Sequence, residues 1–169
     1  VKSREIGLPG LMIAEEFGGV GQSALCGALV LDALASECAG LASIFAYHFA
    51  GCLPLSLAGG TIKERALTPL ANSDSEALAI ATLIGLSLQE PGSLQLVEKK
   101  GKLRLSGTSP AAGNTTFATH VVVFIEEDEN KGEFTGIVVE EGTPGMTAGD
   151  SLGLPGLKVN PFAPLIFDD

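Results

Sequence analysis

The first half of the chain carries apolar residues at helical spacing. Residues 23–39 are apolar on nearly all sides, with only Asp32 and Glu37 charged, and a helix of that kind is normally buried by its neighbours. A second helix is expected over residues 41–57, where one side carries an apolar stripe made of Leu41, Ile44, Phe45, His48, Phe49 and Cys52. Pro54 is expected to end or kink this helix. We therefore predict a packed helical region.

A third, shorter helix is expected to begin at Thr61, because Thr61 and Glu64 have the spacing of a capping box. Beyond a turn at residues 72–75, the pattern changes to short β-type runs separated by Gly- and Pro-rich turns. These expected strands cover residues 77–88, 94–97, 103–105, 119–125, 134–140 and 165–167. The second and third should flank a basic turn, and the fourth should pair with the fifth across an acidic loop.

Helices followed by strands predict an α+β fold. We expect a helical N-terminal domain at residues 1–76, followed by a small antiparallel β-barrel or sandwich domain at residues 77–169. Residues 86–93 lie near the seam between the two regions, where ligand sites often form.

The charge and composition exclude several classes of protein. A hydrophobic content of 46% excludes a disordered acidic tail as the overall class. The net charge of -10, with the basic residues scattered, argues against nucleic acid as a partner. Cys26, Cys38 and Cys52 all lie in apolar helical sequence and are expected to be buried free thiols, which fits a reducing, cytoplasmic location.

Two further interpretations are weighed against simpler ones. Residues 38–62 contain no Asp, Glu, Lys or Arg and could cross a bilayer by length, but His48, Pro54 and several glycines favour a buried helix pair, so no membrane span is predicted. His48 has no second His or Cys at metal-ligand spacing, so a packed helical histidine is expected and no metal site is predicted.

Four segments resemble the acyl-CoA dehydrogenase family, in the same order along the chain. Residues 14–21 (AEEFGGVG) look like the family's P-E-E-x-G-G-x-G segment, and residues 48–74 look like its run from a histidine to G-x-x-E-Q-K and L-P-x-L-A. Residues 140–146 (EEGTPGM) are close to its V-E-x-G-T-P-G-F turn, and residues 165–169 (LIFDD) resemble its L-x-F-x-D strand. Their order and spacing cover nearly the whole chain.

The resemblance implies a helical domain and a middle β-barrel that binds FAD against a C-terminal helical bundle. Family members oxidise the Cα–Cβ bond of an acyl-CoA thioester, with a glutamate base removing the α-proton and the flavin taking the β-hydride. The family would continue beyond Asp169 into that bundle, which supplies the catalytic glutamate and oligomer contacts. No catalytic residue is therefore assigned, and we expect a truncated member, inactive alone, that still forms a homo-oligomer through exposed apolar helix surface.

The resemblance also places the flavin loop, with changes. The family reads A-x-T-E-P-x-A-G-S-D where this chain has Leu88-Gln89-Glu90-Pro91-Gly92-Ser93, so Gln89 replaces the threonine and the loop is shorter. The tryptophan of the family's W-I-T/S-N-G strand falls at about Ala111, and an arginine of a later motif becomes Pro155. The residues implied for cofactor binding are Leu86, Ser87, Leu88, Gln89, Gly92, Ser93 and Gly113.

Two hypotheses follow from this resemblance and its departures. The first is a part of an FAD-dependent enzyme that acts on acyl-CoA. The second is a degenerate, non-catalytic family member that keeps the scaffold without flavin and acts as a binding or structural protein.

Overall fold

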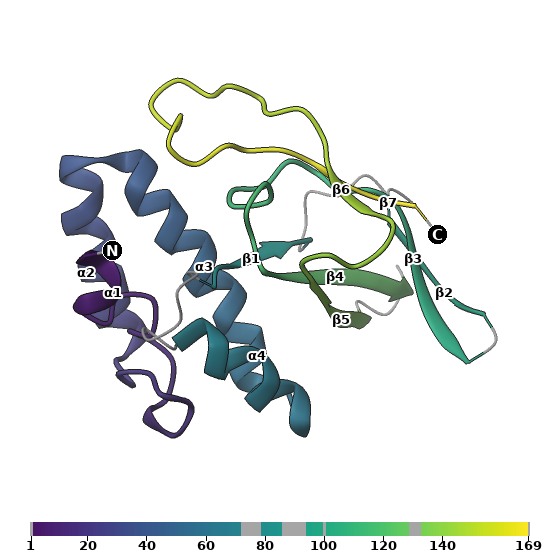
Figure 1. Cartoon of the computed structure of the whole chain (residues 1–169), viewed down its shortest axis with the longest axis horizontal. Helices are drawn as coiled ribbons and strands as arrows, with labels where there is room; N and C mark the ends of the chain where they lie inside the picture. Colours follow the sequence, from purple (N-terminus) through teal and green to yellow (C-terminus); the bar gives the residue numbers. More distant parts are fainter. Residues whose placement is uncertain (1, 72–78, 86–93, 100, 129–132, 169) are drawn as a thin grey trace.

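The computed structural model describes residues 2–71, 79–85, 94–99, 101–128 and 133–168. The helices are α1 (Lys2–Glu5), a 3-10 turn (Glu15–Phe17), α2 (Ala24–Glu37), α3 (Ala39–Leu57) and α4 (Thr61–Ala71). The strands are β1 (Ala81–Ile84), β2 (Leu94–Lys99), β3 (Lys102–Thr108), β4 (His120–Asp128), β5 (Glu133–Glu140), β6 (Met146–Ala148) and β7 (Leu165–Phe167). The helices form one layer and the strands lie beside it, as Figure 1 shows.

The three predicted helices are confirmed. The Ser23 side chain caps α2 by accepting a hydrogen bond from the Cys26 amide at 3.3 Å, which satisfies one of the open donors of the first turn. Helix α3 continues past Pro54 for one turn and ends at Leu57, and α4 begins at Thr61.

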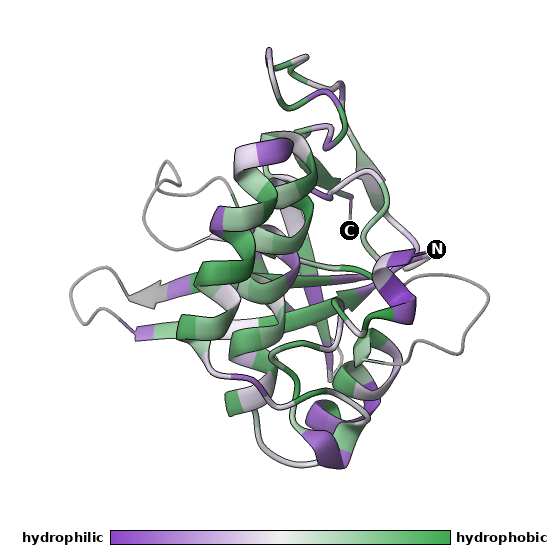
Figure 2. Ribbon diagram, turned by 90° about the vertical axis from the view of Figure 1, so that its left-hand side faces the viewer, coloured by the Kyte–Doolittle hydropathy of each residue, from purple (hydrophilic) through white to green (hydrophobic). Residues whose placement is uncertain are grey.

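The expectation that neighbours bury α2 on all sides is wrong, and the expectation of exposed apolar helix surface is confirmed. Only Gly27 of this helix is buried, and Leu25 and Leu29 are 70% and 63% exposed. Helix α2 packs mainly against α3, and Leu11 and Met12 belong to the same hydrophobic cluster. Apolar residues run along the length of the long helices in Figure 2, so part of this apolar surface faces solvent.

The strands form two sheets. Strands β1, β4 and β5 form the first, and the second has the order β2-β3-β7-β6 with every pair antiparallel. The α+β class is confirmed, as are the hairpin β2–β3 and the pairing of β4 with β5. In the first sheet, β1 runs parallel to β4. The described strands leave both sheets open and do not close a barrel.

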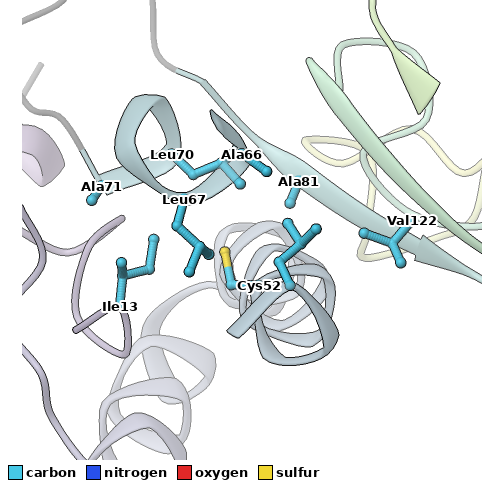
Figure 3. Close-up of a cluster of buried hydrophobic side chains, with 9 residues drawn as sticks. Ile13, Cys52, Ala66, Leu67, Leu70, Ala71, Ala81 and Val122 are labelled. Carbon is cyan, nitrogen blue, oxygen red and sulfur yellow. The ribbon is translucent and has the colours of Figure 1, made fainter. Parts of the chain in front are cut away.

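One hydrophobic cluster joins the helices to the first sheet. Ile13 and Leu67 meet Cys52 of α3, and Ala81 of β1 and Val122 of β4 complete the cluster from the sheet (Figure 3). Helix α3 approaches β1 closely at Gly51, where an added Cβ would lie 2.8 Å from the Ala81 Cβ. A second cluster, which includes Val121, Val123 and Leu165, lies between the two sheets.

The expectation for the cysteines holds in part. All three thiols are free, but only Cys52 is buried, while Cys26 is half-buried and Cys38 is exposed where α2 meets α3. Of the helices in the described residues, α3 is the one that length and composition would allow to cross a membrane. Because α3 packs against α2, α4 and β1, its apolar sequence is explained by the protein core.

Candidate functional site

Of the residues predicted to bind a cofactor, the structure describes only Gly113. Leu86, Ser87, Leu88, Gln89, Gly92 and Ser93 lie outside the described residues. Gly113 lies in the loop that precedes β4, next to α3, β1 and the loop that precedes β7. We call the contact of these four segments the Gly113 junction.

Gly113 is enclosed by side chains of this chain. A Cβ added to it would lie 2.6 Å from Asn160 Nδ2 and 2.7 Å from Tyr47 Cδ2. The Tyr47 ring packs edge-on against Phe162, with 5.3 Å between the ring centroids. The Gly113 carbonyl accepts a hydrogen bond from the Thr82 hydroxyl at 2.6 Å. The space beside the Gly113 Cα is therefore filled, and it offers no open cradle to an atom of a cofactor.

Asn114 connects the four segments of the junction. Its amide nitrogen Nδ2 donates to the carbonyls of Ile44 at 2.9 Å and Ala81 at 3.2 Å, and its backbone N–H donates to Asn160 Oδ1 at 2.7 Å. Asn160 Nδ2 in turn donates to the Ser43 hydroxyl on α3 at 3.0 Å. Asn114 has φ of 65°, a left-handed conformation that asparagine tolerates better than most residues.

The Asn114 side chain also leaves one buried atom without a partner. Because two carbonyls fix the orientation of Nδ2, Oδ1 points the other way, and it has no hydrogen bond among the described residues. Asn114 is fully buried, so this oxygen lies inside the junction and does not face an open ligand site. The residues present thus fit a structural junction, and they do not fit a flavin contact at Gly113.

His48 links α3 to β1 immediately beside this junction. Its Nε2 lies 2.8 Å from the Pro9 carbonyl oxygen, and its Nδ1 accepts from the Ala81 amide at 3.1 Å. A carbonyl can only accept and an amide N–H can only donate, so the ring is neutral with its proton on Nε2. The pKa of His48 is lowered to about 4, chiefly by burial; the Pro9 hydrogen bond opposes this effect, and the charge of His120 adds a smaller lowering. His48 is the packed helical histidine that the sequence predicted.

His48 predicts a loss of stability in mild acid. Its pKa is about 4 in the folded chain and about 6.5 in an unfolded chain. Between these values the unfolded chain binds more protons, so the free energy of unfolding falls as pH decreases. We expect a decrease of about 2 kcal/mol from about pH 7 to about pH 5, measured by urea unfolding. The lowered pKa of His120 acts in the same direction.

The control for this experiment is the variant His48→Leu, which has no titrating group at this position. Its free energy of unfolding should vary less over the same pH range. Equal pH dependence in both proteins would show that His48 is not the source.

The described residues hold no evident catalytic group. They contain no group of three His, Cys, Asp or Glu side chains that could hold a metal ion. The buried polar groups are hydroxyls, amides and histidines, and burial raises the pKa of the Cys52 thiol to about 12, so this thiol stays protonated near neutral pH. Sequence reasoning missed Asn114, Asn160, Thr82 and Tyr47, because it took its candidates from the family's flavin motifs. These four residues act through shape and neutral hydrogen bonds between distant segments.

Residues 2–74 match the model of the family described as acyl-CoA dehydrogenase, N-terminal domain. This match covers the helical region of the chain, and the middle region is matched by individual relatives and solved structures named as acyl-CoA dehydrogenases.

Individual relatives match almost the whole chain. It is 28% identical over 186 residues to acryloyl-CoA reductase (NADH) of Anaerotignum propionicum, covering 99% of this chain and 44% of that protein. It is 29% identical over 182 residues to the mitochondrial short-chain specific acyl-CoA dehydrogenase of Mus musculus, covering 99% and 42%. A Bacillus anthracis acyl-CoA dehydrogenase solved with FAD superimposes with a TM-score of 0.82 at 25% identity, covering 99% and 29%. The chain spans less than half the length of each.

Proposed function

We propose that this chain forms the helical and middle β part of an FAD-dependent acyl-CoA dehydrogenase that oxidises an acyl-CoA thioester. The observation that carries the proposal is the match over 99% of the chain to relatives named for acyl-CoA chemistry. The shared fold with a family member solved with FAD supports FAD as the cofactor. The flavin loop at residues 86–93 is the part of this chain proposed to bind it.

We assign no reaction step to the described residues. The space beside Gly113 is filled by Tyr47 and Asn160, so a flavin would have to be held elsewhere. The doubly hydrogen-bonded His48 orients β1 against α3 and stays uncharged near neutral pH.

The alternative is a family member that keeps this scaffold without flavin and acts as a binding or structural protein. The filled space at Gly113 favours it, since the family has a hydroxyl-bearing residue there and this chain has an internal contact instead. The changes at Gln89 and Ala111 favour it for the same reason.

Visible absorption separates the two proposals. The purified chain is incubated with FAD and passed over a desalting column. An enzyme part should retain flavin absorbance with the protein, and Gln89→Ala should weaken retention by about tenfold through loss of a hydrogen bond to the flavin. Gln95→Ala is the matched control, because Gln95 is exposed on β2. A wild-type chain that retains no flavin excludes FAD binding by these 169 residues alone, as the scaffold proposal expects.

Association and location are further proposals. The exposed side chains of Leu25 and Leu29 on α2 support a homo-oligomer, because exposed apolar patches drive association. The three free thiols support a reducing compartment such as the cytoplasm.

A further inference from the structure

Strand β5 is an edge of the first sheet. It pairs with β4 on one side, and none of the described strands pairs with its other side (Figure 1). Its eight residues contain no Lys or Pro, the residues that commonly protect a sheet edge from further pairing. Gly136 and Phe134 are exposed on it, Phe134 by 46%.

The direction of the backbone groups along β5 follows from two hydrogen bonds. The Glu141 amide donates to the Thr119 carbonyl at 2.9 Å, toward β4. Every second residue of a strand points its N–H and C=O groups to the same side, so those of residues 135, 137 and 139 also point at β4. The His120 amide donates to Ile80 at 3.2 Å, toward β1, which gives the same alternation from the other side of β4. The N–H and C=O groups of Gly136 and Val138 therefore point outward.

These outward groups are available for pairing. Neither Gly136 nor Val138 uses them in a hydrogen bond to another described residue. The Glu140 carbonyl, the next outward acceptor, is already used by the Thr143 amide and hydroxyl. The open edge thus centres on residues 134–138.

A cavity lies on each side of this edge. On the helix side, a cavity of about 690 Å³ is lined by Val138 and Gly136 together with Leu57 and Ile62. On the side of the second sheet, a cavity of about 400 Å³ is lined by Ile137 and Val139 together with Met146 and Phe167. Side chains of a strand alternate between the two faces of a sheet. A strand added beside β5 would therefore direct alternate side chains toward the two cavities.

The charges at the ends of β5 decide between a second copy and another partner. Glu133 and Glu141 are exposed and form no ion pair with another described residue, whereas Glu140 pairs with Arg65 at 2.7 Å. Antiparallel pairing of two copies centred on Ile137 would place Gly136 opposite Val138, and Glu133 opposite Glu141 at both ends. Pairing centred on Gly136 would still leave Glu133 diagonal to Glu141 at both ends. Like charges directly opposite each other destabilise a strand pair. A partner with basic residues at these two places would instead be attracted.

We propose that the outer edge of β5 binds an extended peptide segment by strand addition, with apolar side chains in the two flanking cavities and Lys or Arg opposite Glu133 and Glu141. Main-chain hydrogen bonds provide affinity in this binding mode, and pockets for alternate side chains provide specificity. The inference does not depend on FAD, because no residue of the flavin loop takes part in it.

Fluorescence anisotropy with a synthetic peptide tests the proposal on the full chain. The labelled peptide has blocked ends, a lysine at each end and alternating Val and Ile between them, so that apolar side chains face both cavities. We expect saturable binding that weakens at about 0.5 M salt. Val138→Pro removes one outward N–H, a change that an edge strand tolerates, and should weaken binding at least about tenfold. Val138→Thr keeps this N–H and should bind within about twofold of wild type.

Two controls keep the outcome clear. A peptide N-methylated on its pairing edge should not bind, which tests strand addition even if Val138→Pro fails to fold. The double variant Glu133→Lys and Glu141→Lys should prefer a glutamate-flanked peptide. Absence of binding by wild type, or equal binding by Val138→Pro and Val138→Thr, would overturn the proposal. A wild-type dimer that Val138→Pro dissociates in sedimentation would assign the edge to a second copy instead.

Discussion

Replacing His48 by leucine should lower the free energy of unfolding by about 3 kcal/mol, measured by urea unfolding at neutral pH. Leucine fills much of the ring volume but removes two buried hydrogen bonds. The Pro9 carbonyl and the Ala81 amide then lose their partner, and both lie in the interior. An unpartnered buried backbone group costs roughly 1–3 kcal/mol, more than the mean value of a hydrogen bond.

The matched control is the same substitution at the other histidine. His120 contacts the Thr119 hydroxyl at 3.0 Å, and that hydroxyl keeps its hydrogen bond to the Ile80 carbonyl without His120. His120→Leu should therefore cost below about 1 kcal/mol. Equal losses in the two variants would mean that the hydrogen bonds of His48 do not connect α3 to β1 in the way described.

Gly113→Ala should destabilise the chain by about 2–4 kcal/mol in the same assay. The methyl group would enter space held by Asn160 Nδ2 and Tyr47 Cδ2, both nearer than 3 Å. The junction cannot yield easily, because the Asn160 amide is hydrogen-bonded to Ser43 and the Tyr47 ring packs on Phe162.

Gly59→Ala provides the control, since no atom lies within 4 Å of a Cβ at this position, and it should change stability by less than about 0.5 kcal/mol. In a Tyr47→Ala background, the cost of Gly113→Ala should shrink, because one of the two contacts is gone. If the cost is unchanged in that background, Tyr47 does not enclose Gly113.

Local patterns predicted most of the elements. The short apolar runs at residues 94–97 and 103–105 are separated by a Gly-containing turn, and they pair as the hairpin β2–β3. The parallel pairing of β1 with β4 could not be predicted in this way. Alternation of apolar residues describes the two faces of a strand and contains no information on its direction or on a partner 39 residues away.

The same limit applies to burial. Helix α2 is as apolar in sequence as a buried helix, yet Leu25 is exposed, because burial depends on which elements are present to cover a surface. Cys38 is exposed for a related reason, since it lies between two helices rather than within either.

The residues of the candidate site were predicted only from the resemblance to the family's flavin motifs. The flavin-loop residues 86–93 stay a prediction, because they lie outside the described residues, and so does the division of the chain at residues 76 and 77. Gly113 was predicted as a cofactor contact, and the structure places it beside Tyr47 and Asn160. Asn160 lies 46 residues from its partner Asn114, and no local pattern links two such asparagines.

The close approach of α3 to β1 at Gly51 has a consequence for how the chain unfolds. Ala81 of β1 shares a core with Ile13 and Leu67 of the helical region, and its amide holds the His48 ring. The helical region therefore cannot separate from the first sheet without exposing that core and leaving His48 without one of its two partners. Helices and first sheet should lose their protection against hydrogen exchange together, as one cooperative unit, while the exposed end of the hairpin β2–β3, at Glu98, Lys99, Lys102 and Leu103, is free to open first.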